Sequence, residues 1–256
     1  MILYLVLVFI FGSAVGSFLN VVIDRAVNGG SIMGRSHCDW CRATLSTVDL
    51  VPIISFVGLG AKCRHCRKKL SWQYPIVEGL TAILFTIAFW VVVGSGNLDF
   101  IKLGFWLLLI SVLVVVFVVD FRFSLIPTTF VYAMSLVALF FVYFTSAPPV
   151  FIDHVIAALG ACLFFLLIVL VTFGRGMGQG DVVLAFLIGL VLGVKVTVLA
   201  MFLAFLSGAM VSIILLVLGR KKFGNTIPFG PFLVFGFVVA LFWSELILIY
   251  YFKMLY

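Results

Sequence analysis

Long apolar runs separated by short polar segments follow one another along the whole chain. Most runs approach or exceed the roughly 17–25 residues that a membrane-spanning helix needs, and only Lys195 separates the sixth from the seventh. The pattern predicts an all-α, polytopic membrane helix bundle with about eight transmembrane helices. The predicted runs are Met1–Ile23, Glu78–Val93, Leu103–Val119, Phe130–Thr145, Val155–Phe173, Asp181–Val194, Val196–Leu218 and Leu233–Phe252.

The composition supports lipid as the main solvent of this chain. Hydrophobic residues make up 65% and charged residues 10% of its 256 positions, and the mean hydropathy is +1.38. An ordinary soluble domain has about 45–50% apolar and about 25% charged residues. This composition excludes a disordered chain and a disulfide-stapled secreted module. The first run has no basic segment before it, so we expect a retained helix and not a cleaved signal peptide.

The net charge of +7 is explained by membrane topology. If the N-terminus is outside, segments 24–77, 120–129, 174–180 and 219–232 face the cytoplasm and hold 13 of the 16 Lys and Arg residues. Cytoplasmic loops of membrane proteins carry such an excess. We therefore predict that both termini lie outside. The alternative, a basic patch for nucleic acid, is disfavoured, and no nucleic-acid partner is expected.

The first hydrophilic segment, 24–77, contains four cysteines in two pairs. Cys38 and Cys41 form one C-x-x-C, and Cys63 and Cys66 form the other. Two such turns complete a tetrahedral four-sulfur site, which favours structural zinc. Two disulfides, or a redox-active C-x-x-C, are the alternatives, and the predicted cytoplasmic location disfavours disulfides.

Two carboxylates fall at the same end of the predicted bundle. Asp120 ends the third run and Asp181 begins the sixth, and two crossings between them return the chain to its starting side. Two carboxylates in low-dielectric surroundings do not both ionise easily, so such a pair shares a proton. One member then activates water while the other protonates the carbonyl oxygen or the leaving amine. This is the chemistry of an aspartic protease.

Glycines and other acids accompany this pair. Gly178 and Gly180 precede Asp181, and glycine lets the backbone approach a substrate strand closely. The alternatives are a helix N-cap for Asp181 and an interfacial ion pair with Arg122 for Asp120. Glu78 is expected at a helix end or in loop packing, and Glu245 either has a partner inside the bundle or lies at the outer interface.

Several motifs, in this order, resemble those of the type IV prepilin peptidases, a group of GxGD intramembrane aspartic proteases. The resemblance extends over nearly the whole chain. It is carried by Gly16-Ser17-Phe18-Leu19-Asn20, Ser36-x-Cys38-x-x-Cys41, Asp49-Leu50-Val51-Pro52, Lys62-Cys63-Arg64-x-Cys66, Ser71-x-x-Tyr74-Pro75 with Glu78, Asp120 with Ile126-Pro127, Gly176-Met177-Gly178-x-Gly180-Asp181, and Ile227-Pro228-Phe229-Gly230-Pro231-Phe232.

The resemblance implies a function. Asp120 and Asp181 would cleave the short basic leader of prepilins and pseudopilins, at the cytoplasmic face of the bacterial cytoplasmic (inner) membrane. The four cysteines would hold zinc, and the new N-terminus would be methylated with S-adenosylmethionine, whose site the sequence does not identify. The implied domains are 1–23 (first transmembrane helix), 24–77 (zinc-binding loop) and 78–256 (membrane-embedded peptidase).

Three other functions are weighed against this one. A peptidase without methyltransferase activity fits the same carboxylates. A proton-coupled transporter would use Asp120 and Asp181 as protonation sites, but it predicts carboxylates near the bilayer midplane and internal repeats. A membrane scaffold with a zinc-bound docking loop explains the cysteines but leaves two convergent aspartates without a role.

Overall fold

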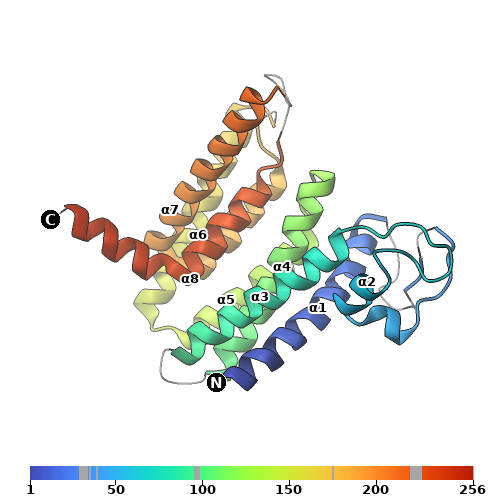
Figure 1. Cartoon of the computed structure of the whole chain (residues 1–256). Coiled ribbons are helices and arrows are strands. Elements are labelled where there is room, and N and C mark those ends of the chain that lie inside the picture. Colours follow the sequence, from blue (N-terminus) through green and yellow to red (C-terminus); the bar gives the residue numbers. More distant parts are fainter. Residues whose placement is uncertain are drawn as a thin grey trace. The chain divides into compact units, whose positions relative to one another are not determined.

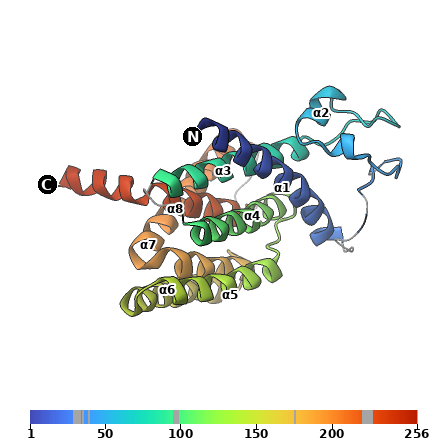
Figure 2. The ribbon, with the colours of Figure 1, turned by 90° about the horizontal axis from the view of Figure 1, so that it is seen from below.

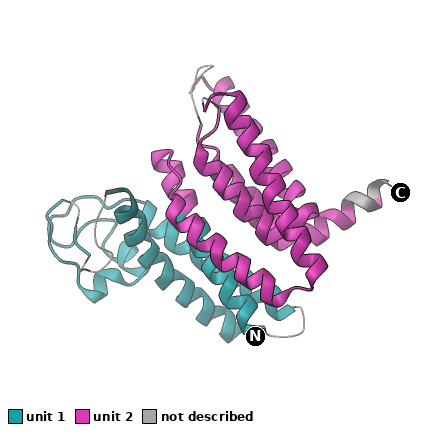
Figure 3. Cartoon of the chain, turned by 180° about the vertical axis from the view of Figure 1, so that it is seen from behind, with its two compact units in different colours: residues 1–115 teal, residues 116–256 magenta. Residues whose placement is uncertain are grey.

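The computed structural model is built from helices only among the residues that it describes, which are 1–28, 34, 36–38, 40–94, 99–174, 176–219 and 227–255. Five of the basic residues counted above, Arg35, Arg175, Arg220, Lys221 and Lys222, lie outside these ranges. The chain forms two compact units, residues 1–115 and 116–256 (Figure 3). Its elements are α1 (Ile2–Asn28), η1 (Thr47–Leu50), α2 (Ile54–Gly58), α3 (Gln73–Gly94), α4 (Phe100–Phe123), α5 (Thr128–Thr145), α6 (Pro148–Val171), α7 (Gln179–Val217) and α8 (Gly230–Leu255) (Figure 1).

Seven helices in the described residues are long and apolar enough to cross a membrane. The predicted all-α membrane bundle is therefore confirmed. α7 counts as one helix here, but its 39 residues contain both the sixth and the seventh predicted runs, and its backbone is not helical at Gly193. A straight helix of that length would extend about 58 Å, nearly twice the roughly 30 Å thickness of the hydrocarbon layer.

The helix α7 is not straight, because it reverses at Gly193. Gly189, before this point, packs on α6: a Cβ on it would lie 2.5 Å from the carbonyl oxygen of Ala157. Phe205, after this point, stacks on Phe165 of α6 with ring centroids 6.0 Å apart. Phe165 lies nearer than Ala157 to the end of α6, and the start of α7 follows that end in the chain. The residues after Gly193 therefore run back along α6 toward the start of α7. α7 thus has two antiparallel legs, and Lys195 stands just after the turn.

The reversal is held by side chains of α6. Gly193 has φ +71°, a left-handed conformation that favours glycine. The next residue, Val194, donates its backbone N–H to Asp153 Oδ2 at 3.0 Å. His154 Nδ1 lies 2.8 Å from the carbonyl oxygen of Leu190. These contacts satisfy backbone groups that the break in the helix would otherwise leave unpaired in an apolar environment.

In unit 1, α1 packs closely on α3 (Figures 1 and 2). Gly12 and Gly16 form the contact, as their G-x-x-x-G spacing predicts. A Cβ on Gly12 would lie 2.8 Å from Ala82 Cα, and one on Gly16 would lie 2.7 Å from Glu78 Cα. This backbone contact holds together α1 and α3, the two helices that the cysteine loop connects.

In unit 2, the core lies among α6, α7 and α8. Small residues bring the helices together, since a Cβ on Gly236 of α8 would overlap the carbonyl oxygen of Ala200 in α7. An aromatic cluster fills the space nearer the start of α8. Its rings are Phe165, Phe205 and Phe229, with centroids 5.0 to 6.1 Å apart. The segment that leads into α8 is therefore anchored against α6 and against α7, the helix that carries Asp181.

Candidate active site and metal centre

Asp120 lies in the last turn of α4 and is buried, with 4% of its surface exposed. The helix ends just after it: Ser124 has φ +53° and donates its backbone N–H to the carbonyl oxygen of Asp120 at 2.8 Å. Ile126 and Pro127 then lead into α5. Among the described residues Asp120 Oδ2 has no hydrogen-bond partner, although it is buried. A buried polar atom left in this way is rare and indicates a functional site.

Asp181 lies in the first turn of α7 and is equally buried, at 6% exposed. Its Oδ2 accepts the backbone N–H of Gly178 at 3.1 Å. Gly178, and not Asp181, is the N-cap residue. The alternative that Asp181 is the N-cap is therefore wrong: Asp181 is the third residue of the helix, and one of its carboxylate oxygens accepts the N–H of the N-cap residue. Oδ1 is buried and has no partner within the described chain.

The structure brings the two aspartates together inside unit 2, close enough for their charges to interact. Ile126 fills the space beside them: a Cβ on Gly180 would lie 2.7 Å from its Cβ, and a Cβ on Gly230 would lie 3.2 Å from its Cδ1. Gly180 is thus required by packing against Ile126. The pair presents one unpartnered carboxylate oxygen from each residue.

Gly230 and Ile126 are site residues to which the sequence reasoning gave no role. A Cβ on Gly230 would lie 2.5 Å from Asp120 Oδ2, so the start of α8 lies directly against the carboxylate. Both residues stand within motifs quoted for the family resemblance, Ile126-Pro127 and Gly230-Pro231. A helix that begins at a Gly-Pro pair is the signal that could have directed attention to this contact.

The remaining acids have other surroundings. Glu78 Oε2 accepts the backbone N–H of Ile53 at 2.8 Å, which is the loop packing expected for it. Ile53 has φ +61° and precedes α2, so this bond holds a strained turn of the loop. Glu245 is exposed on α8.

The four cysteines converge in the loop of unit 1, and their sulfur atoms all lie within 4.8 Å of one another. Cys38 Sγ is 3.8 Å from Cys66 Sγ, and Cys41 Sγ is 4.0 Å from Cys63 Sγ. Zinc with Zn–S bonds of about 2.3 Å holds tetrahedral sulfurs about 3.8 Å apart. The S–S bond of a disulfide is only about 2.05 Å long, so the geometry favours the metal.

Two copies of one turn build this site, 25 positions apart in the sequence. In each copy the backbone N–H of the first cysteine donates a hydrogen bond to the carbonyl oxygen of the residue five positions later. Cys38 donates to Ala43 at 3.0 Å, and Cys63 donates to Lys68 at 2.9 Å. The residue after the second cysteine has positive φ in both copies, Arg42 at +53° and Arg67 at +58°. The repeat C-x-x-C-R-x-x-L could have been found in the sequence.

The four thiols affect one another's ionisation. Backbone N–H groups of Cys66 and His65 lower the pKa of the Cys63 thiol to about 6, which favours the metal-binding thiolate there. The Ala43 backbone lowers the pKa of Cys41, but burial and the neighbouring cysteines outweigh it and raise that pKa to about 11.

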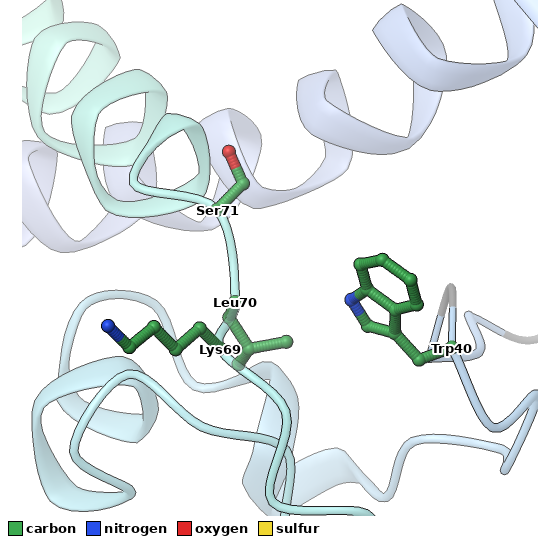
Figure 4. A pocket seen from close by; sticks show the side chains of 4 residues that line it. All are labelled: Trp40, Lys69, Leu70 and Ser71. Atoms are coloured by element: carbon green, nitrogen blue, oxygen red, sulfur yellow. The ribbon is translucent and has the colours of Figure 1, made fainter.

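Trp40 of the first turn points toward Leu70 of the second, while the Lys69 side chain points away (Figure 4). The Lys68 ammonium group of the second turn lies 4.2 Å from the centre of the Trp40 ring, so the two turns are in contact. Zinc bound by the four sulfurs would cross-link them.

Comparisons with known proteins agree over most of the chain. The model of the "Bacterial Peptidase A24 N-terminal domain" matches residues 10–92, and that of the "Type IV leader peptidase family" matches residues 107–213. Curated proteins named "Prepilin leader peptidase/N-methyltransferase" are similar throughout. The one from Bacillus subtilis (strain 168) is 34% identical over 97% of this chain and 98% of its own length. The one from Pseudomonas aeruginosa is 29% identical over 91% of this chain and 88% of its own length. The one from Legionella pneumophila is also 29% identical, over 97% of this chain and 94% of its own length. No solved structure matches the chain.

Proposed function

The chain belongs to the type IV leader peptidase family, as its motifs predict, and we propose that it cleaves prepilin leaders with Asp120 and Asp181 as the catalytic pair. It is thus an enzyme of the prepilin peptidase class and a multi-pass membrane protein of a bacterial family. The single observation that carries the assignment of the residues is the convergence of two buried aspartates, each with an unpartnered oxygen.

The pair divides the acid and base work of peptide hydrolysis. One carboxylate takes a proton from water as the water attacks the carbonyl carbon of the scissile bond. The other, protonated, donates its proton to the carbonyl oxygen. As the C–N bond breaks, the first carboxylate passes the proton that it took from water to the leaving amine, and the second takes back a proton from a hydroxyl of the tetrahedral intermediate. Burial supports this division because two neighbouring carboxylates share a proton in a low-dielectric site.

The glycines around the pair give this site its shape. Gly180 lets Ile126 approach the first turn of α7, and Gly230 lets α8 begin against Asp120. Gly178 donates its N–H to Asp181, which leaves the other oxygen of that residue for the reaction. We therefore include Gly178 and Gly180 in the active-site loop, as proposed from the sequence.

Charge and the two legs of α7 support the orientation that we propose. Segment 24–77 and both aspartates would lie on the cytoplasmic side of the bacterial inner membrane, with both termini outside, because basic residues are in excess in these segments. This arrangement needs an even number of crossings, which agrees with a reversal of the chain at Gly193. The prepilin and pseudopilin substrates would present their basic leaders on that side, ahead of a hydrophobic helix.

The cysteine loop and methylation complete the proposal. Cys38, Cys41, Cys63 and Cys66 would hold a structural zinc ion, which would stabilise a loop with little core of its own. We assign N-methylation of the cleaved substrate, with S-adenosylmethionine as donor, because the relatives are named as N-methyltransferases. The division into domains 1–23, 24–77 and 78–256 stays a prediction.

The test uses Asp120→Asn and Asp181→Asn in the full-length protein, reconstituted with zinc and a prepilin. Both variants should lose cleavage by at least about 100-fold, because asparagine neither accepts nor donates the required proton. Asp99→Asn is the matched control, since Asp99 is a capping acid that accepts backbone N–H groups of Ile101 and Lys102. Cleavage at the wild-type rate by either active-site variant, with wild-type thermal stability, would exclude the paired mechanism.

Methylation is read in the same samples by mass spectrometry of the mature N-terminus. With pre-cleaved substrate, both aspartate variants should still transfer the methyl group, because cleavage and transfer are assigned to different residues. A wild-type protein that cleaves but never methylates would be a peptidase alone.

A further inference from the structure

Two large apolar side chains stand exposed on the cysteine loop, on one side of the short helix α2. Ile54 is 71% exposed and Val57 is 70% exposed. They are three positions apart, which makes them neighbours on the surface of a helix. The other side of α2, with Ser55 and Phe56, lines a cavity within unit 1. α2 thus presents apolar side chains outward, and neither leader cleavage nor the zinc site gives them a role.

Two contacts join α2 to the start of α3 (Figure 1). Ile53, just before α2, donates its backbone N–H to Glu78 Oε2 at 2.8 Å. Phe56 packs edge-on against Trp72, with ring centroids 5.1 Å apart. The carbonyl oxygen of Trp72 accepts the backbone N–H of Ile76 at 3.2 Å, so Trp72 continues the register of α3. α2 therefore lies level with the first turn of a helix that is long and apolar enough to cross a membrane.

The exposed side of α3 leads directly to α2. Its exposed large apolar side chains are Ile76, Ile83 and Trp90, and their spacing of seven residues, close to two helical turns, places them in one stripe. Trp72, 68% exposed, precedes Ile76 by four positions and lies on the same side. A membrane-spanning helix turns such a stripe toward lipid, and tryptophan is enriched where lipid meets water. Trp72 thus marks this boundary, and α2 lies beside it.

Basic residues surround this apolar surface in the sequence. Segment 40–74 contains six Lys and Arg residues and a single acid, Asp49, which pairs with Arg64 at 2.9 Å. Five of the six lie between α2 and Trp72, and all five are exposed. Anionic lipid headgroups attract basic segments that lie next to a membrane helix. Apolar side chains together with basic residues are characteristic of a segment that lies in the membrane interface.

We propose that α2 lies in the headgroup boundary of the bilayer, with Ile54 and Val57 inserted beside Trp72, and that anionic lipid holds the cysteine loop against the membrane. The inference goes beyond leader cleavage and does not depend on it, because it uses only the membrane-spanning position of α3. A protein partner is disfavoured, since three side chains are far fewer than the roughly 20–30 residues that each side of a stable protein–protein interface contributes.

The test is photocrosslinking of the zinc-loaded full-length protein in vesicles of phosphatidylethanolamine and anionic phosphatidylglycerol. Ile54→p-benzoylphenylalanine and Val57→p-benzoylphenylalanine, made separately, place a photoreactive ketone on the exposed side of α2. Mass spectrometry then identifies what each position has captured. Both should capture lipid, as should Ile83→p-benzoylphenylalanine on the exposed stripe of α3, which is the positive control.

Ser55→p-benzoylphenylalanine is the matched control on the same helix, because Ser55 lines the cavity. It should capture residues of its own chain and at least about 10-fold less lipid than position 57, since an interfacial segment buries only one side in lipid. Zinc content and thermal unfolding equal to those of the wild type show that each variant is folded. Positions 54 and 57 are independent, so one folded variant of the two is enough for the test.

The captured lipids also test the role of charge. Phosphatidylglycerol should be enriched about two-fold among the adducts of position 57 relative to those of position 83, because the basic residues of the loop concentrate anionic lipid. Equal compositions at the two positions would refute the attraction by charge.

Three results would overturn the insertion of α2. One is the absence of lipid adducts at positions 54 and 57 while position 83 captures lipid. Another is capture of a second copy of the chain in place of lipid, which would make this surface a protein contact. The third is equal capture of lipid at positions 55 and 57. Failure of the same vesicles to cleave prepilin, with lipid captured as expected, would contradict the proposed peptidase function and leave this inference standing.

Discussion

Gly230→Ala tests whether the position of the Asp120 carboxylate controls cleavage. The added Cβ would lie 2.5 Å from Asp120 Oδ2 and 3.1 Å from its Cγ, and real Cβ contacts under 3.0 Å are essentially never seen. The carboxylate must therefore move by at least about 0.5 Å, the tolerance usual for a catalytic group. A displacement of about 1 Å costs up to 100-fold in rate. We expect kcat to fall by about 10- to 100-fold.

The assay is cleavage of a purified prepilin in detergent, followed by gel mobility, with kcat and KM determined separately. Gly160→Ala in α6 is the control, because a Cβ there meets nothing within 4 Å. Gly160→Ala should melt at or above the wild-type temperature, since alanine favours helices by roughly 0.5–1 kcal/mol over glycine. Gly230→Ala should lose about 1–3 kcal/mol through its overlap with Asp120, so cleavage is measured well below its melting temperature.

A double variant separates displacement of Asp120 from general damage. If Gly230→Ala acts only through Asp120, adding it to Asp120→Asn should cause no further loss. A wild-type kcat for Gly230→Ala, or a full additional loss in the double variant, would refute the reasoning that the start of α8 positions this carboxylate.

Four further outcomes are expected. Gly16→Ala should lower stability by about 1–3 kcal/mol in thermal unfolding, because its Cβ would overlap the α3 backbone, whereas Gly79→Ala, with open space around it, should not. Gly193→Ala should lower stability by about 1–3 kcal/mol, because alanine is strained at φ +71°. Zinc removal by a chelator should speed hydrogen exchange in segments 36–45 and 61–70 and leave α6 protected. Asp49→Asn should speed exchange around η1 about two-fold at pH 7, equivalent to about 0.5 kcal/mol. The Ser46 hydroxyl and Arg64 lower the pKa of Asp49, so this contribution is complete at neutral pH and is lost only as pH falls below the ordinary Asp range.

The helices and the chemistry-bearing residues could be predicted from the sequence because both leave local signals. A run such as Phe130–Thr145 is apolar enough to indicate a membrane helix without knowledge of its neighbours. The C-x-x-C pairs constrain four sulfurs to two turns, and the sulfur distances agree with that expectation. Asp120 and Asp181 were expected at one end of the bundle by counting crossings alone.

The close contacts within the site could not be predicted in the same way. Whether Gly230 touches Asp120 depends on how α8 packs in unit 2, and no local pattern encodes that distance. A cavity in unit 1 could not be predicted either, because its lining comes from α1, α3 and both cysteine turns. Positions separated by up to 61 residues, Ser17 and Glu78, meet there.

The reversal at Gly193 shows how a small local signal decides the arrangement of the active site. An uninterrupted α7 would carry the chain away from Asp181 by about 58 Å and leave α8 on the far side of the bilayer. The turn instead returns the second leg along α6, and Phe205 packs on Phe229 with ring centroids 5.0 Å apart, just before α8 begins. Gly230 therefore reaches Asp120. A glycine in left-handed conformation, held by Asp153, thus closes the site from a position at the opposite end of the helices.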